Sequence, residues 1–158
     1  MNWQEVCEHP SLQDLPFKIE LNEWGEIVMS PTKVYHGFYQ GEIGFLLRSM
    51  QQDGKVISEC AIKTRQGTKV ADVVWVSAKR FKKIKHEFDC SMAPEVCVEV
   101  VFASDTQAHM REKRELYFEA GAQEVWFCSK TGAISFYNAE GKLARSSLFP
   151  TFSKKIEL

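Results

Sequence analysis

The alternation of apolar and polar residues predicts a chain in which strands and helices follow one another. Short runs rich in β-branched and aromatic residues are typical of strands, and they occur at residues 17–21, 26–30, 55–64, 69–77, 95–102, 124–129 and 133–138. Helical spacing or capping residues mark four further stretches, near residues 3–9, 31–51, 79–86 and 106–120. This order favours an α/β fold with a mixed central β-sheet flanked by helices.

Capping residues set the expected boundaries of the two longer helices. Ser30 followed by Pro31 is a combination that opens a helix, which we expect to run to about Gln51. Ser104 begins a capping box for the second helix. Gly121 has the residue type that commonly follows a helix end.

Length and composition are those of a soluble globular protein. The chain has 158 residues, of which 44% are hydrophobic and 26% charged, so we expect a single domain over residues 1–158. No apolar run is long enough for a membrane span, and the N-terminus lacks a signal-peptide pattern. The five cysteines form no CxxC pair, which favours a reduced, cytoplasmic protein without a structural zinc site. Three of them lie in predicted strands and should pack as small apolar groups: Cys60, Cys97 and Cys128.

The net charge of −1 is low for a dedicated DNA-reading protein, but the basic residues are unevenly placed. The segment KRFKKIKH, residues 79–86, supplies four candidate contacts to phosphate: Lys79, Arg80, Lys82 and Lys83. One interpretation is a solvated surface helix whose Phe81 and Ile84 face inward. The other is a phosphate-contacting stripe beside an active site. The sequence leaves both open.

A carboxylate within an apolar strand is the first indication of chemistry. Glu99 interrupts the run EVCVEVVF, where a lone charge costs several kcal/mol unless it is paired, protonated or bound to a cation. Asp72 has a similar setting, and Glu20 and Glu59 repeat it more weakly. Each could instead lie at a strand end or on a polar face. If they converge, a divalent cation such as Mg²⁺ or Mn²⁺ would relieve their repulsion.

Lys113 lies on the apolar face of its predicted helix, together with Met110, Leu116, Tyr117 and Ala120. Its stem could lead the ammonium past the helix edge to water, or the ammonium could lie beside Glu99. Two carboxylates, a metal ion and a lysine are the groups needed to hydrolyse a phosphodiester. The metal polarises the phosphoryl group and lowers the pKa of a bound water, and the lysine positions that water or neutralises developing charge.

His36 shares a face of the first long helix with Gln40, Ile43 and Leu47. A buried histidine bonded to the backbone is one interpretation, and a contact with phosphate or water near the site is the other. His36 and Gln40 are therefore candidates for substrate binding.

Several segments, in order, resemble the Uma-type restriction-endonuclease family of the PD-(D/E)XK nuclease superfamily. They are FKIELNEWGEIVMSP, the region around His36, ADVVWVS, APEVCVEVVFASD, REKRELYFEAGAQEVWF and SSLFPTF. The resemblance covers nearly the whole chain. It implies a restriction-endonuclease-like core, a Mg²⁺-dependent centre in which Mn²⁺ can substitute, and DNA as the substrate.

The resemblance also implies roles for individual residues. Asp72 matches the aspartate of the family's PD motif, and Glu99 matches the acid on the next core strand; both would hold the metal. The superfamily's usual lysine would fall at Val101, but Uma-type relatives place a lysine on the following helix, where Lys113 fits. Glu20 matches an acid of the first strand that supports the metal or its water.

The match departs from the family next to the proposed centre. Ala71 replaces the proline before the aspartate, and Phe102-Ala103 replaces a serine-proline pair. A nuclease-fold module that binds nucleic acid or a protein without turnover is therefore the leading alternative to a DNA endonuclease. A hydrolase of other phosphate esters is a weaker one. A homodimer is plausible, because cutting both strands usually takes two active sites.

Overall fold

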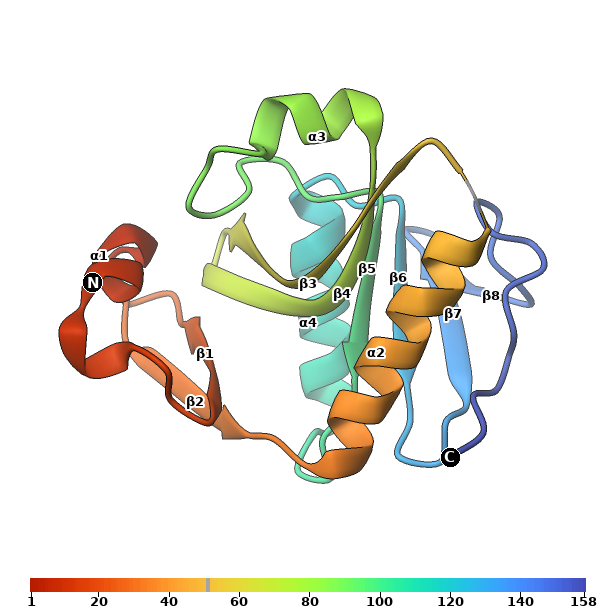
Figure 1. Ribbon diagram of the computed structural model, residues 1–158, viewed down its shortest axis with the longest axis horizontal. Helices are drawn as coiled ribbons and strands as arrows, with labels where there is room; N and C mark the ends of the chain where they lie inside the picture. Colours follow the sequence, from red (N-terminus) through yellow and green to blue (C-terminus); the bar gives the residue numbers. More distant parts are fainter. Residues whose placement is uncertain (51) are drawn as a thin grey trace.

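The computed structural model describes residues 1–50 and 52–158 and is organised around a six-stranded mixed sheet (Figure 1). The strand order is β3-β4-β5-β6-β7-β8. The strands span Gly54–Thr64 (β3), Gly67–Ser77 (β4), Val96–Val100 (β5), Glu124–Cys128 (β6), Ile134–Asn138 (β7) and Gly141–Leu143 (β8). All neighbours are antiparallel except β5 and β6, which are parallel and connected through helix α4 (Gln107–Glu119). The predicted mixed α/β sheet is confirmed.

A hairpin of β1 (Phe17–Leu21) and β2 (Ile27–Pro31) forms a separate two-stranded sheet. It follows α1 (Trp3–Glu8) and a short 3₁₀ turn (Pro10–Leu12). The hairpin lies beside β4, where the Lys69 ammonium donates to the carbonyl of Leu21 at 3.0 Å. In Figure 1 it occupies the lower left, outside the main sheet. Its position brings side chains of β1 to the edge of the central strands.

Helices cover both faces of the main sheet, as Figure 1 shows for α2 (Val34–Ser49) and α4. Tyr39 and Ile43 of α2 are fully buried in an apolar cluster with the central strand residues and the C-terminal segment. Tyr117 of α4 is buried in the cluster on the other face. The two strands that carry Asp72 and Glu99 are therefore covered on both sides, as continuous apolar runs require.

The predicted start of the first long helix is wrong. Ser30 and Pro31 belong to β2, where they pair with Lys18 and Phe17 of β1. The hairpin ladder thus takes up the residues that local capping chemistry would place at a helix start. Helix α2 begins at Val34 and ends at Ser49, and the expected end near Gln51 lies outside the described residues.

The cap of α4 is also displaced, from Ser104 to Thr106. The Thr106 side chain accepts a hydrogen bond from the backbone of His109 at 3.1 Å. Ser104 lies inside a turn closed by Asp105, whose carboxylate accepts from the backbone N–H of Phe102 at 2.7 Å. Gly121 follows the helix end with φ +113°, which confirms its predicted position and requires a residue without Cβ strain.

The predicted packing of the three strand cysteines agrees with the structure. Cys60, Cys97 and Cys128 are buried free thiols, and no disulfide links the described cysteines. Within residues 1–50 and 52–158, no helix has both the length and the apolar character needed to cross a membrane.

Candidate active site

Asp72 lies where β4 and β5 separate. Their pairing runs from Trp75 and Val96 to Val73 and Val98. Beyond that pair, the Asp72 carboxylate accepts a hydrogen bond from the backbone N–H of Val100 at 2.7 Å. The carboxylate replaces the strand partner that this buried N–H would otherwise need. Asp72 is thereby fixed between the two central strands with 1% of its surface exposed.

Glu99, on β5, is buried and paired on both of its oxygens. Oε1 accepts from the Tyr117 hydroxyl at 2.5 Å and lies 3.1 Å from the Lys113 ammonium. Oε2 accepts from the Lys18 ammonium at 2.9 Å. Of the alternatives for this acid, the structure shows the paired one, because the strand does not open to water here.

Lys18 is the central cation of the site, and sequence analysis missed it. Its Nζ lies 2.9 Å from Glu99, 3.2 Å from Asp72 and 4.0 Å from Glu20, and its side chain is only 4% exposed. A signal was available, because alternate strand residues share a face. In FKIEL, an inward Glu20 therefore requires an inward Lys18.

Lys113 and Glu20 complete the cluster. The Lys113 ammonium lies 2.8 Å from Glu20 Oε2, and the same carboxylate accepts from the backbone N–H of Val70 at 2.7 Å. Lys113 is 22% exposed, so its ammonium faces both the carboxylates and the opening. The inward orientation expected from the helical face is the one observed.

The lysine and the aspartate at the centre hold each other ionised. Burial disfavours the Lys18 ammonium, but Glu99, Asp72 and Glu20 outweigh it and raise the pKa of Lys18 above its ordinary value. Burial also disfavours the ionised form of Asp72, and burial alone would therefore raise the pKa of this carboxyl. The His36 ring, Lys18 and the Val100 N–H more than compensate and lower that pKa.

The pKa values of the two glutamates of the cluster are shifted in opposite directions. Burial, reinforced by Asp72 and Glu20, raises the pKa of Glu99 despite Lys113 and Lys18. For Glu20 the two lysines outweigh burial and lower its pKa. Of the two glutamates, Glu99 is therefore the one whose ionised form is disfavoured by its surroundings.

His36 approaches the cluster from α2. It is buried, its Nε2 lies 3.4 Å from Asp72 Oδ2, and its ring stacks on Phe102 with centroids 4.7 Å apart. Among the described residues, Nε2 has no hydrogen-bond partner. Gln40, one turn along the helix, is partly buried. Within the described residues, it forms no hydrogen bond or ion pair with the cluster.

The carboxylates match a divalent cation in chemistry, although the position is filled. Asp72 and Glu99 direct hard oxygens toward one point, as Mg²⁺ or Mn²⁺ requires, and that point holds the Lys18 ammonium. Over residues 1–50 and 52–158, no group of three or more acidic, histidine or cysteine side chains is arranged to hold a metal ion. A metal would therefore take the place of an existing cation.

The cluster opens to the surface through a narrow cleft. A cavity of about 70 Å³ lies against Lys18, Glu99 and Lys113. A wider depression of about 400 Å³ shares Glu20 and Lys113 with it and reaches His109 at its rim. Of the two ammonium groups in the cluster, that of Lys113 is the more exposed at this opening.

The basic helix is not beside this cluster, contrary to one of the two interpretations of its sequence. Helix α3 (Ala78–Ile84) starts where β4 ends, five residues after Asp72, which corresponds to about 16 Å of extended strand. Figure 1 shows it at the upper end of the sheet. Three of its basic side chains are exposed: Lys79, Lys82 and Lys83.

Arg80 has structural contacts instead. Its Nη1 donates to the carbonyls of Ala93 and Gly121, both at 2.8 Å, and its Nε lies 3.7 Å from Glu95. Glu59, expected as a weaker member of the carboxylate group, is exposed with φ +53°. It lies outside the cluster.

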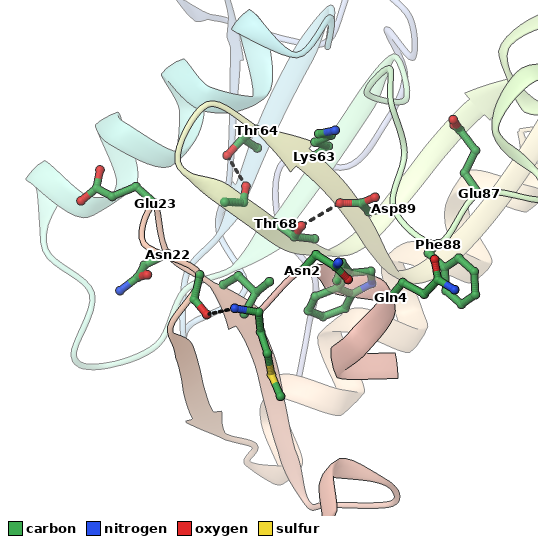
Figure 2. A pocket seen from close by; sticks show the side chains of 15 residues that line it. Asn2, Gln4, Asn22, Glu23, Lys63, Thr64, Thr68, Glu87, Phe88 and Asp89 are labelled. Atoms are coloured by element: carbon green, nitrogen blue, oxygen red, sulfur yellow. Dashed lines mark hydrogen bonds between the residues drawn. The ribbon is translucent and has the colours of Figure 1, made fainter. Parts of the chain in front are cut away.

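The larger groove in Figure 2 is unsuited to a nucleic-acid backbone. It has a volume of about 590 Å³ and lies between α1, the hairpin turn and the β3–β4 turn. Glu23, Glu87 and Asp89 line it, against one lysine, Lys63. This surplus of carboxylates would repel phosphate, so cavity size does not identify the chemistry of this protein.

Comparison with known proteins agrees with the fold. A search of curated proteins gives no match. The structure resembles a crystal structure described as "a putative nuclease belonging to DUF820" from Anabaena variabilis, with a TM-score of 0.69 and 16% identity over 97% of this chain and 82% of that one. At this identity the likeness shows a shared fold. The sequence model of Uma2, described as "Putative restriction endonuclease", matches residues 3–155. The resemblance seen in the sequence is confirmed, and the chain belongs to the Uma2 family.

Proposed function

We propose that this protein is an endonuclease that hydrolyses phosphodiester bonds in DNA with Mg²⁺, for which Mn²⁺ can substitute. Family membership supports a nuclease-type function. The observation that carries the finer proposal is the convergence of Asp72 and Glu99, from adjacent strands, on one cation position with Lys113 alongside.

Each side chain has a defined task in this proposal. Asp72 and Glu99 would hold the metal, which when bound polarises the phosphoryl group and lowers the pKa of a bound water. Glu20, held by the Val70 N–H, would support that water. Lys113 would neutralise the charge that develops on the phosphate, because its side chain lines both the narrow cavity and the wider depression.

Two further side chains would hold the ligands in place. Tyr117 donates to Glu99, and His36 lies against Asp72. Partners of this kind orient metal ligands and commonly change affinity or activity 10- to 100-fold. His36 is therefore assigned to positioning.

The same proposal includes a cellular environment, a substrate and an oligomeric state. The five free cysteines suit a reducing, cytoplasmic environment. DNA is the proposed substrate from the description of the family. Cleavage of both strands would need two copies of the site, so we propose a homodimer on DNA.

Cleavage of supercoiled plasmid and of single-stranded DNA in Mg²⁺ and Mn²⁺ tests the proposal. The wild-type protein and Glu59→Gln should cut at the same rate, since Glu59 is an exposed carboxylate on the neighbouring strand. Glu99→Gln should lose at least ~100-fold, because it removes a metal ligand. Equal cleavage by wild type and Glu99→Gln would contradict the assignment.

A second candidate is a nuclease-fold module that binds nucleic acid or a protein without turnover. The buried Lys18 ammonium at the cation position favours it. Calorimetric titration with Mn²⁺ separates the two functions. Binding that disappears in Asp72→Asn supports the endonuclease, and no binding at millimolar Mn²⁺ together with no cleavage supports the module.

A further inference from the structure

We propose that Lys18 is a built-in competitor of the metal ion: its ammonium occupies the cation position and leaves when a divalent cation binds. This inference rests on the proposed metal-dependent function. It assigns to Lys18 the control of metal affinity, a role different from those of Lys113 and the carboxylates.

Distances make simultaneous occupancy unfavourable. The Lys18 ammonium contacts Asp72 Oδ1 at 3.2 Å and Glu99 Oε2 at 2.9 Å. These are the oxygens directed to a common point, and Mg²⁺ would bind such oxygens at about 2.1 Å. A metal ion held by both carboxylates would therefore lie in contact with the ammonium that now fills the position.

The charges of the cluster favour exchange over addition. Three carboxylates, on Glu20, Asp72 and Glu99, face the two ammonium groups of Lys18 and Lys113, which leaves one excess negative charge. A divalent cation added to this set would leave one excess positive charge and bring cations together. A divalent cation that replaces the Lys18 ammonium makes the cluster neutral.

The structure contains space beside the cluster for the displaced Lys18 side chain. Lys18 belongs to the hairpin, which forms its own two-stranded sheet and, over residues 1–50 and 52–158, has no ladder with the main sheet. Its side chain also borders the cavity of about 70 Å³ that Ser30 and Phe102 help to line, which has room for about two water molecules. A flexible lysine stem can turn into that space and point its ammonium into the cleft where a phosphate would bind.

A linkage between metal and substrate follows. Without substrate, Lys18 competes for the carboxylates and lowers metal affinity. A phosphate in the cleft would give the displaced ammonium a new partner and so favour the metal-bound state. Because coupling between two ligands is reciprocal, the metal should raise the affinity for DNA by the same factor.

Mn²⁺ titration of Lys18→Met measures the competition without relying on catalysis. The variant should bind Mn²⁺ at least ~10-fold more tightly than wild type, within the usual range of coupling between sites. The Mn²⁺-free variant should melt at a lower temperature, because three carboxylates then face one lysine. Saturating Mn²⁺ should raise its melting temperature more than that of wild type.

Lys69→Met is the matched control. Lys69 is a partly buried lysine near the same cleft that donates to the carbonyl of Leu21, so its loss tests the general effect of removing a positive charge. We expect less than ~3-fold change in Mn²⁺ affinity, since this ammonium does not contact the carboxylates that converge on Lys18. If Lys18→Met is poorly folded by circular dichroism, Lys18→Gln provides the same comparison.

The outcomes separate the two proposals. Tighter Mn²⁺ binding by the Lys18 variant that is lost when Asp72→Asn is added supports the competitor role. Equal affinity in wild type and the Lys18 variant overturns that role and leaves the metal-dependent function standing. No Mn²⁺ binding by either protein overturns the metal centre itself, and the competitor role with it.

Discussion

Glu99 and Glu124 are buried to a similar degree on adjacent strands, yet their partners differ in kind. Both lie in five-residue strands that are buried throughout, with 4% and 2% of their surfaces exposed. Glu99 is balanced by two ammonium groups and the Tyr117 hydroxyl. Glu124 accepts four hydrogen bonds from neutral donors: Trp126 Nε1, Ser146 Oγ and the backbone N–H groups of Ser147 and Leu148.

The difference distinguishes an acid with a structural role from the acid for which we propose a chemical one. Two of these donors are backbone N–H groups and two belong to buried side chains, so a free cation cannot replace them, and Glu124 holds the C-terminal segment against β6. Ammonium groups on flexible side chains are partners that another cation can replace, and our proposal is that a metal ion does so at Glu99. The charge and mobility of the partners, rather than burial, are the reasons for proposing Glu99 and not Glu124 as the metal-binding carboxylate.

Removing the two acids should have unequal effects on stability. Glu124→Ala should lower the free energy of unfolding by about 3–5 kcal/mol, because it leaves several buried donors without an acceptor. Glu99→Ala should cost about 1–2 kcal/mol, since Lys18 keeps Asp72 and Lys113 keeps Glu20 as partners. Urea denaturation of both variants provides the comparison, which would fail if Glu99→Ala were as destabilising as Glu124→Ala.

A third buried acid, Glu95, extends the comparison to the other end of the sheet. Its partner Arg80 is fixed by the carbonyls of Ala93 and Gly121. Arg80→Met should therefore lower the free energy of unfolding by about 2–3 kcal/mol, with no change in Mn²⁺ affinity. The control is Lys79→Met, at an exposed position, which should unfold at the same urea concentration as wild type. Weaker Mn²⁺ binding by Arg80→Met would contradict the separation of the two regions.

Much of the fold could be predicted from the sequence, because buried strands have a local signature. The β-branched runs predicted every strand except β8, Gly141–Leu143. Those three residues form no apolar run, and the strand exists because a turn returns them to the edge of β7. The predictions of two helix starts, at Ser30 and Ser104, were wrong. Both residues could serve as caps, but Ser30 belongs to a strand ladder and Ser104 to a turn.

The site was predictable only in part, because some of its residues are brought together by tertiary contacts that leave no local signal in the sequence. Asp72, Glu99, Lys113 and Glu20 lie in one cluster, while their catalytic roles stay a proposal. Lys18 was missed because a lysine in a hairpin strand suggests a solvated face, and only the docking of the hairpin beside β4 brings it inside. The basic segment, residues 79–86, shows the opposite case, in which the residues were recognised but their location was not. Its charges are evident in the sequence, but nothing local indicates the end of the sheet at which they lie.

His36 tests whether the cluster depends on support from α2. His36→Phe keeps an aromatic ring to stack on Phe102 and removes the nitrogen that lies 3.4 Å from Asp72. Mn²⁺ affinity should fall about 10-fold, the lower end of the range for groups that orient metal ligands. The melting temperature should change little, because Nε2 makes no hydrogen bond within the described residues. Unchanged Mn²⁺ affinity would mean that His36 only packs.

The smallest effect should come from the exposed lysines of α3. Reversing two charges, in Lys82→Glu/Lys83→Glu, should leave cleavage and the slope of log affinity for DNA against log salt unchanged, because this helix lies about 16 Å along β4 from Asp72. The same slope measured for Lys113→Glu should decrease, since that ammonium reaches the cleft. A phosphate contact by both α3 lysines would lower the slope by about 2. That result would extend the DNA surface from the carboxylate cluster to the far end of the sheet.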